Sequence, residues 1–279
     1  MPDGSSLRDA LDICSELDIE GVELGSNHCH EGNYDYLSVY EFQYLTHNYF
    51  PIPEQSLVVN IASLDETLRA ASIDHIKKAI LFSCSNDCSL YTFHPGFIAD
   101  PVDKNKDDSS YDFQFGDTEI NQDRKNSARK NMYRSIDTII EFAADKDITI
   151  AIETEGSVTN ADKLLMQEPA EYREFIKRYA STDIGINLNI GHLNLAAHHF
   201  SFDRLEFALD IKDFVVAMEL SHNDMQNDDH RPLERDQWYW SLINAPEFSN
   251  VPKILEYRNA TSGELGQSVA LFREMTHVL

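Results

Sequence analysis

The chain has 279 residues, of which 48 are acidic and 23 are basic, so its formal net charge at pH 7 is −25. Such a surplus of negative charge repels phosphate backbones and argues against a nucleic-acid partner. Its hydrophobic content of 42% is ordinary for a globular protein, and no apolar run reaches the roughly 20 residues that a membrane span needs.

The N-terminal segment predicts a helix followed by a strand. Residues 1–12 have neither the basic start nor the apolar stretch of a secretory signal, which favours a cytoplasmic protein. Ser6 can cap a helix whose apolar residues recur at helical spacing from Leu7 to Leu17, and residues 19–25 (IEGVELG) then form a strand. The chain has four cysteines, and none of them shows CxxC spacing. We therefore expect buried thiols rather than disulfides.

Six further apolar runs each end on a side chain that can bind a metal. In chain order these predicted strands end on His47, His94, Glu153, Asn189, Glu219 and Glu256. Parallel strands that are buried on both faces read as such runs, and barrel enzymes carry their chemistry where the strands end. Six endings of this kind favour one convergent metal site over six separate solvent-facing residues.

Helical patterns separate the strands. The spacing predicts helices over about residues 64–83, 121–146, 168–180, 202–210 and 262–278. The alternation predicts an α/β fold, a TIM (β/α)8-type barrel that forms a single domain over residues 1–279. The predicted strands number seven rather than eight, so we expect the first strand to be missing at the N-terminus. Residues 100–123 carry eight acids against two lysines and are expected to form a solvated loop over the barrel mouth.

Several phrases occur in the order that they have in a known family. They are LTHNYFPIP, VVNIASLDETLRAASI, FHPGF, IETEG, NIGHLNLA, ELSHNDMQNDDH and ILEYR. Through them the chain resembles the xylose isomerase-like TIM barrel superfamily over nearly its whole length. The resemblance is closest to the branch that contains endonuclease IV and the sugar isomerases and epimerases. It implies a cluster of up to three divalent metals at the carboxyl ends of the strands.

The resemblance also implies which residues bind these metals. His47 and His94 would bind the first metal, with Glu153 bridging to the second. The second metal would be bound by Glu153, Asn189, Glu219 and Glu256, and the third by His192, Asp228 and His230. Imidazole and carboxylate donors suit zinc, manganese or iron, so we expect one to three such ions as cofactors.

Two positions depart from the family pattern. Asn189 stands where the family usually has Asp, and Glu219 stands where it usually has His. The first change removes a negative charge and the second adds one, so the total charge can be conserved while the geometry of the second metal changes. We keep His222 as a rival ligand, although it would point to the other side of a continuing strand.

Further side chains are expected to contact the substrate. Arg231 and Arg258 could bind a carboxylate, a phosphate or sugar hydroxyls through their guanidinium groups. Trp238 could supply an apolar wall, and we count Asn189 among the substrate-binding residues as well.

Three functions are compatible with this pattern. The leading one is a metal-dependent isomerase or epimerase of a sugar, sugar phosphate or polyol, in which Glu153 and Glu256 transfer a proton beside a metal-polarised carbonyl. The second is a phosphodiester hydrolase similar to endonuclease IV, which the ligands favour and the net charge opposes. The third is a repurposed barrel that binds a ligand without turnover. We expect a small-molecule substrate and neither a nucleic-acid nor a membrane partner, and the sequence leaves a homo-oligomer open.

Overall fold

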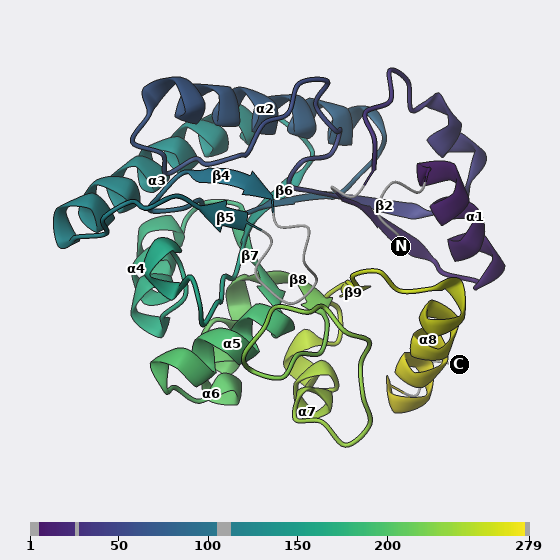
Figure 1. The fold of residues 1–279 in the computed structure, drawn as a ribbon. Coiled ribbons are helices and arrows are strands. Elements are labelled where there is room, and N and C mark those ends of the chain that lie inside the picture. Colours follow the sequence, from purple (N-terminus) through teal and green to yellow (C-terminus); the bar gives the residue numbers. More distant parts are fainter. Residues whose placement is uncertain (1–5, 26–27, 105–112, 277–279) are drawn as a thin grey trace.

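The structure is a computed structural model that describes residues 6–25, 28–104 and 113–276. Its centre is a sheet of seven parallel strands in a TIM-barrel arrangement (Figure 1). In the order in which they pair, the strands are β1 (Gly21–Leu24), β2 (Gln43–His47), β3 (Leu90–Phe93), β6 (Thr149–Glu153), β7 (Ile184–Asn189), β8 (Val215–Leu220) and β9 (Lys253–Leu255). The sequence predicts these same seven strands, because each is a short run of mainly apolar residues between helical segments.

Helices surround the strands (Figure 1). They are α1 (Leu7–Glu16), α2 (Glu66–Ser85), α3 (Gln122–Ala143), α4 (Pro169–Tyr179), α5 (Ile190–Phe200), α6 (Arg204–Asp210), α7 (Tyr239–Ile243) and α8 (Ser262–Thr276). Short 3-10 helices in the connections are η1 (Asp35–Val39), η2 (Ala161–Lys163), η3 (Lys212–Phe214) and η4 (Pro246–Phe248). As predicted, Ser6 caps α1, because its hydroxyl accepts a hydrogen bond of 3.1 Å from the backbone N–H of Asp9. None of the helices in the described ranges is both long and apolar enough to cross a membrane.

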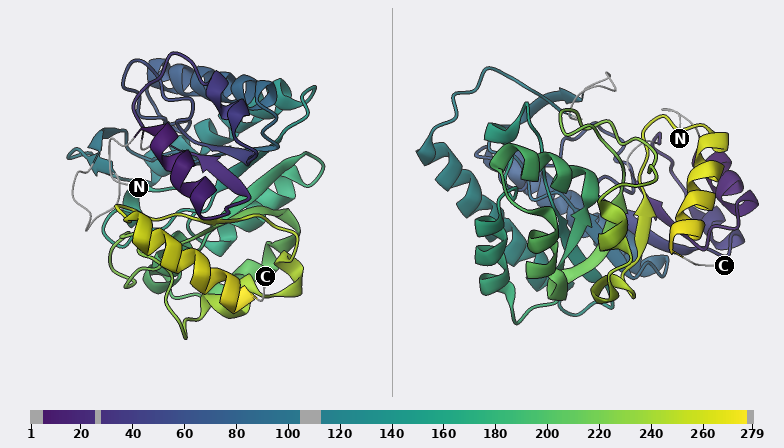
Figure 2. Two further views of the ribbon diagram at one scale, coloured as in Figure 1. Left: turned by 90° about the vertical axis from the view of Figure 1, so that its right-hand side faces the viewer. Right: turned by 90° about the horizontal axis from the view of Figure 1, so that it is seen from below.

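Helices α1 and α8 lie together at the side where the first and last described strands, β1 and β9, do not pair with each other (Figure 2). Within the described residues, β1 pairs only with β2, and β9 pairs only with β8. Helix α8 lies beside α1 (Figure 2), and Arg273 donates hydrogen bonds to the carbonyls of Leu17 and Asp18 at the end of α1, at 3.2 and 2.6 Å. A cation is favourable there because the last carbonyls of a helix carry partial negative charge.

The acidic segment differs from its prediction. In place of a solvated loop, two antiparallel strands, β4 (Pro101–Lys104) and β5 (Phe113–Phe115), lie within residues 100–123. Phe113 and Phe115 both pack on Phe97, with ring centroids 5.0 and 5.5 Å away. The loop prediction was wrong because these aromatic side chains anchor the segment on the barrel. Residues 105–112 of the segment lie outside the described residues.

One layer of apolar side chains inside the barrel determines where the candidate site lies. It consists of Leu45, Leu90, Ala151, Ala217 and Ile254. Successive side chains of a strand point to opposite faces, so the residue two positions farther along points to the same interior. On β2, β6 and β8 and just after β9, these next residues are His47, Glu153, Glu219 and Glu256. The four strands therefore present these side chains at one end of the barrel.

Candidate metal centre

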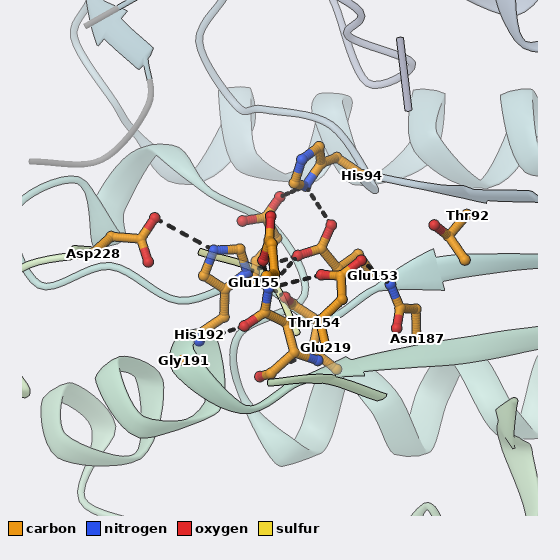
Figure 3. Close-up of polar contacts among 12 residues, drawn as sticks. Thr92, His94, Glu153, Thr154, Glu155, Asn187, Gly191, His192, Glu219 and Asp228 are labelled. Carbon is orange, nitrogen blue, oxygen red and sulfur yellow. Dashed lines mark hydrogen bonds and ion pairs between the residues drawn. The ribbon is translucent and has the colours of Figure 1, made fainter. Parts of the chain in front are cut away.

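The carboxyl ends of the strands bring the predicted ligands into one buried cluster. Glu153 is paired with Asn187 across β6 and β7, and Asn189 is paired with Glu219 across β7 and β8. Glu153, Asn189 and Glu219 are each at most 1% exposed. Figure 3 shows the Glu153 carboxylate between the imidazole groups of His94 and His192.

The first triad consists of His47, His94 and Glu153. Glu153 Oε2 lies 3.6 Å from His47 Nε2 and 3.4 Å from His94 Nδ1, and the two imidazole centroids are 5.4 Å apart. Thr92 Oγ1 contacts His47 Nδ1 at 2.8 Å and holds this ring in place. The donor atoms of the triad lie within 4.8 Å of one another, which is close enough for one metal with ligand distances of about 2 Å.

The second triad consists of His192, Asp228 and His230. Asp228 Oδ2 lies 3.5 Å from His192 Nε2 and 3.1 Å from His230 Nε2, and these donor atoms are also within 4.8 Å of one another. His192 lies in the first turn of α5, which packs directly on Gly156. A Cβ at Gly156 would stand 1.9 Å from the carbonyl oxygen of His192, so only glycine permits this approach. The packing brings His192 Nδ1 to 3.0 Å from Glu153 Oε1 and joins the two triads.

Asn189 links the carboxylates between the triads. Its Nδ2 lies 2.9 Å from Glu153 Oε1, 2.8 Å from Glu219 Oε2 and 3.0 Å from Glu256 Oε2. Its Oδ1 accepts a hydrogen bond of 3.1 Å from the backbone N–H of His192, as the N-cap of α5. The cap determines which end of the amide donates, so Asn189 is a donor to three carboxylates in this structure.

Three residues near the ligands were missed by the sequence analysis. Glu23 lies next to the end of β1, and its carboxylate forms a further group of donor atoms with His47 and Glu219, all within 4.8 Å of one another. Strand alternation could have found it, since Val22 and Leu24 pack in the outer cluster beside α1 and Glu23 must then face the interior. The residues missed are Glu23, Glu155 and Asn187.

Opposite charges shift the pKa values of the first triad. Burial alone would lower the pKa of His94, but Glu153 and Glu155 raise it to about 9. Glu155 Oε1 is only 2.8 Å from His94 Nδ1. His47 differs, because burial lowers its pKa and outweighs the attraction of Glu153. At neutral pH the metal-free triad therefore holds one histidinium, whose proton a metal ligated at His94 would displace.

The second triad holds its charge as ion pairs. Burial opposes ionisation of all three groups, yet their mutual attraction raises the pKa values of His192 and His230 and lowers that of Asp228 well below its usual value. The acids between the triads behave in the opposite way. Burial and the neighbouring carboxylates raise the pKa values of Glu23 and Glu219 well above the usual range, so these carboxyl groups hold protons when no cation is near.

Buried lone pairs show that the residues fit a divalent cation. Glu153 Oε2 and Asp228 Oδ1 are buried oxygens that accept no hydrogen bond from the described residues. Buried polar atoms without such partners are costly, and a cation would compensate them. Since each triad combines imidazole with carboxylate, both sets of donors suit zinc, manganese or iron.

The two predicted arginines contact acidic residues of the loop after β8. Arg258 Nη1 donates to the carbonyl oxygen of Asp228 at 3.1 Å, and its Nη2 lies 4.0 Å from Asp228 Oδ2. Arg231 Nε lies 2.9 Å from Asp229 Oδ2. These contacts hold the loop that carries the second triad, and substrate contact by either arginine stays a prediction.

Trp238 and His222 have partners away from the triads. The guanidinium of Arg204 lies 4.4 Å from the ring centroid of Trp238. His222 Nε2 lies 3.5 Å from Glu234 Oε2. The geometry therefore gives His222 a carboxylate partner outside the two triads.

Comparison with known proteins identifies relatives of this chain. The family model described as "Xylose isomerase-like TIM barrel" matches residues 11–275. The uncharacterized protein MJ1311 of Methanocaldococcus jannaschii is 24% identical over 228 residues, which are 81% of this chain and 69% of that protein.

Solved structures share the fold. A D-tagatose 3-epimerase-like protein superposes with a TM-score of 0.76 at 19% identity, covering 98% of this chain and 94% of the other. A D-psicose 3-epimerase from Clostridium cellulolyticum H10, crystallised with D-tagatose, superposes with a TM-score of 0.63 at 10% identity, covering 99% and 88%. At these identities the likeness shows the fold. The family match over residues 11–275 shows that the chain belongs to the xylose isomerase-like TIM barrel family, as the sequence resemblance predicts.

Proposed function

We propose that this xylose isomerase-like barrel is a metal-dependent isomerase or epimerase that acts on a sugar, a sugar phosphate or a related polyol. The observation that carries the proposal is the placement of Glu153 and Glu256 around one amide nitrogen, Asn189 Nδ2, at 2.9 and 3.0 Å. Isomerases and epimerases take a proton from carbon and return one. Two carboxyl groups directed at the same point provide both roles.

Glu153 is suited to be the base. Burial would raise its pKa, but His94 and His192 lower it below its usual value, so the carboxylate is ionised and can accept the proton from a substrate carbon. Glu256 would return a proton that it first receives from His230, whose Nδ1 lies 3.0 Å from Glu256 Oε2. Burial opposes ionisation, yet this contact lowers the pKa of Glu256 below its usual value, so the carboxylate depends on that supply. A divalent metal held by the triads would polarise the substrate carbonyl and the adjacent hydroxyl.

The structural neighbours support a sugar as the substrate class. Two proteins with this fold are named a D-tagatose 3-epimerase-like protein and a D-psicose 3-epimerase. The buried position of the proposed base also favours a small substrate, since Glu153 is 1% exposed at the end of the barrel interior.

A phosphodiester hydrolase similar to endonuclease IV is the second candidate. The observation that favours it is the presence of two complete triads, since metal clusters activate water and stabilise phosphate oxygens in such enzymes. The net charge of −25 opposes it, because it offers no gain from counterion release at a DNA backbone.

One pair of assays separates the candidates. The metal-loaded protein is incubated in deuterated water with D-tagatose, D-psicose and D-fructose, and carbon-bound deuterium is followed by NMR. We expect exchange that a chelator abolishes. Specific cleavage of a duplex with an abasic site, abolished by chelator and by His94→Ala, would establish the hydrolase instead. Neither exchange nor cleavage would indicate a barrel that binds its ligand without turnover.

A further inference from the structure

The amide of Asn189 fills the point at which three carboxylates meet. Its Nδ2 is within 3.0 Å of oxygens of Glu153, Glu219 and Glu256, and two N–H bonds serve all three. A cation at this point would have to displace the amide. The amide cannot simply turn its oxygen inward, because Oδ1 accepts the cap hydrogen bond from the N–H of His192.

A second group of donors lies on the side of β1. Glu219 Oε1 lies 3.6 Å from His47 Nδ1 and accepts a hydrogen bond of 2.6 Å from Asn187 Nδ2. The donor atoms of Glu23, His47 and Glu219 lie within 4.8 Å of one another. Glu23 Oε1 is buried, and it has no hydrogen-bond partner among the described residues. Two adjacent carboxylates with a buried, unpartnered oxygen are costly, so the pair must hold either protons or a cation.

We propose that this chain binds a divalent cation between Glu23 and Glu219, with His47 as the third donor, in a site displaced from Asn189 toward β1. The inference rests on the metal dependence in the proposed function and adds a ligand, Glu23, that the family resemblance does not supply. Glu219, which stands in place of the usual His, contributes to this site through the oxygen that faces His47.

The donor set selects the kind of cation. Two carboxylates and one imidazole form an oxygen-rich site that suits Mn²⁺ or Fe²⁺, whereas the first triad has two imidazoles and suits Zn²⁺ better. His47 joins the two, because its Nδ1 lies 3.6 Å from Glu219 Oε1 and its Nε2 lies 3.6 Å from Glu153 Oε2. A cation bound at Nδ1 would replace the contact of this nitrogen with Thr92 Oγ1. A neutral imidazole has one nitrogen lone pair, so His47 binds one ion at a time. The displaced site and the first triad therefore compete for it.

The test measures metal affinity in a background that lacks the second triad. His230→Asn removes one of its ligands and keeps a residue that tolerates the left-handed backbone there, where φ is 46°. In this background we compare Glu23→Gln with His94→Ala by calorimetric titration of Mn²⁺ and of Zn²⁺, and we follow bound Mn²⁺ by electron paramagnetic resonance. Glu20→Gln is the matched control, because Glu20 is exposed just before the same strand.

We expect Glu23→Gln to lower the affinity for Mn²⁺ at least about tenfold and to change the affinity for Zn²⁺ little. His94→Ala should lower the affinity for Zn²⁺ and change the affinity for Mn²⁺ little. Glu23→Asp keeps the charge on a shorter side chain, so its Mn²⁺ affinity should lie between that of Glu23→Gln and that of the His230→Asn background. It replaces Glu23→Gln in the test if that variant does not fold. Equal Mn²⁺ affinity in the Glu23→Gln and Glu20→Gln variants, with loss in His94→Ala, would overturn the displaced site and leave the proposed function standing. Absence of metal binding in the unsubstituted protein would overturn both.

Discussion

The two histidine triads and the acids between them hold buried negative charge in different ways. In the second triad Asp228 faces two imidazoles at 3.1 and 3.5 Å, so charge is balanced within the triad. Between the triads, Glu219 has two amides, a neutral histidine and Glu23 as its neighbours. The triads thus carry ion pairs, whereas the acids between them, Glu23 and Glu219, carry protons or a cation; we call this part of the site the middle. The two positions that depart from the family pattern, Asn189 and Glu219, both lie among these acids.

The largest effect is expected for Glu153→Gln, because Glu153 contacts both triads and Asn189. The amide keeps the shape but loses the charge that accepts the proton. Deuterium exchange should fall by about 10² to 10⁴-fold, the range for general acid–base catalysis, with an unchanged circular dichroism spectrum. Glu141→Gln on the exposed face of α3 is the control. Unchanged exchange in a folded Glu153→Gln protein would show that Glu153 is only a strand-end residue.

The next effect tests whether the triads are separate. His94→Ala should weaken one zinc site by more than about 100-fold and leave the other, while Asp228→Asn should weaken the site that His94→Ala spares. Zinc titrations with a chromophoric chelator would measure both. If either substitution abolishes both sites, the triads act as one unit and the comparison with the middle fails.

Asn189→Asp tests the middle directly. A fourth carboxylate in place of the donor leaves those of Glu153, Glu219 and Glu256 without their shared N–H bonds. The chelated variant should lose at least about 1–3 kcal/mol of unfolding free energy, and Mn²⁺ should restore more stability to it than to the unsubstituted protein. Asn126→Asp, at an exposed position of α3, is the control in thermal denaturation. Equal stability of the two chelated variants would show that the amide is not needed there.

The smallest effect is a pH dependence of the metal-free protein. Glu153 and Glu155 outweigh burial and raise the pKa of His94 to about 9, above the value of about 6.5 for an unfolded chain. Its protonation therefore stabilises the fold fully below about pH 6.5, and this contribution is lost as the pH rises through about 9. Thermal denaturation of chelated protein should show this loss, and His94→Ala should flatten the profile. Zinc affinity should rise over the same range, because the metal competes with the proton.

The strands and the triads could be predicted because each depends on a local pattern. Every parallel strand is a short apolar run, and each predicted triad ligand on a strand follows such a run, as His47 and Glu153 do. Residues 113–115 were missed because Phe-Gln-Phe is too short a run to stand out inside an acidic segment. Helix α5 was not predicted because it begins immediately after β7, without the usual connecting loop.

The middle of the site could not be predicted because it depends on distances between strands. Strand alternation puts Glu20 and Glu23 of the phrase IEGVELG on opposite faces, but it does not give the distance from Glu23 to His47 and Glu219. The role of Asn189 required the position of three carboxylates from three strands and a cap hydrogen bond in the same side chain. Residue types predicted which chemistry the barrel can perform, and the register decided where each charge lies.

The contact between α8 and α1 also sets an order for folding during synthesis. Arg273 and the carbonyls of Leu17 and Asp18 are 256 and 255 positions apart in the chain. Contacts between such distant segments form late, because they close the longest loop. When every strand that the structure describes has been synthesised, the barrel would still be open between β1 and β9, until α8 has left the exit tunnel and Arg273 reaches the end of α1.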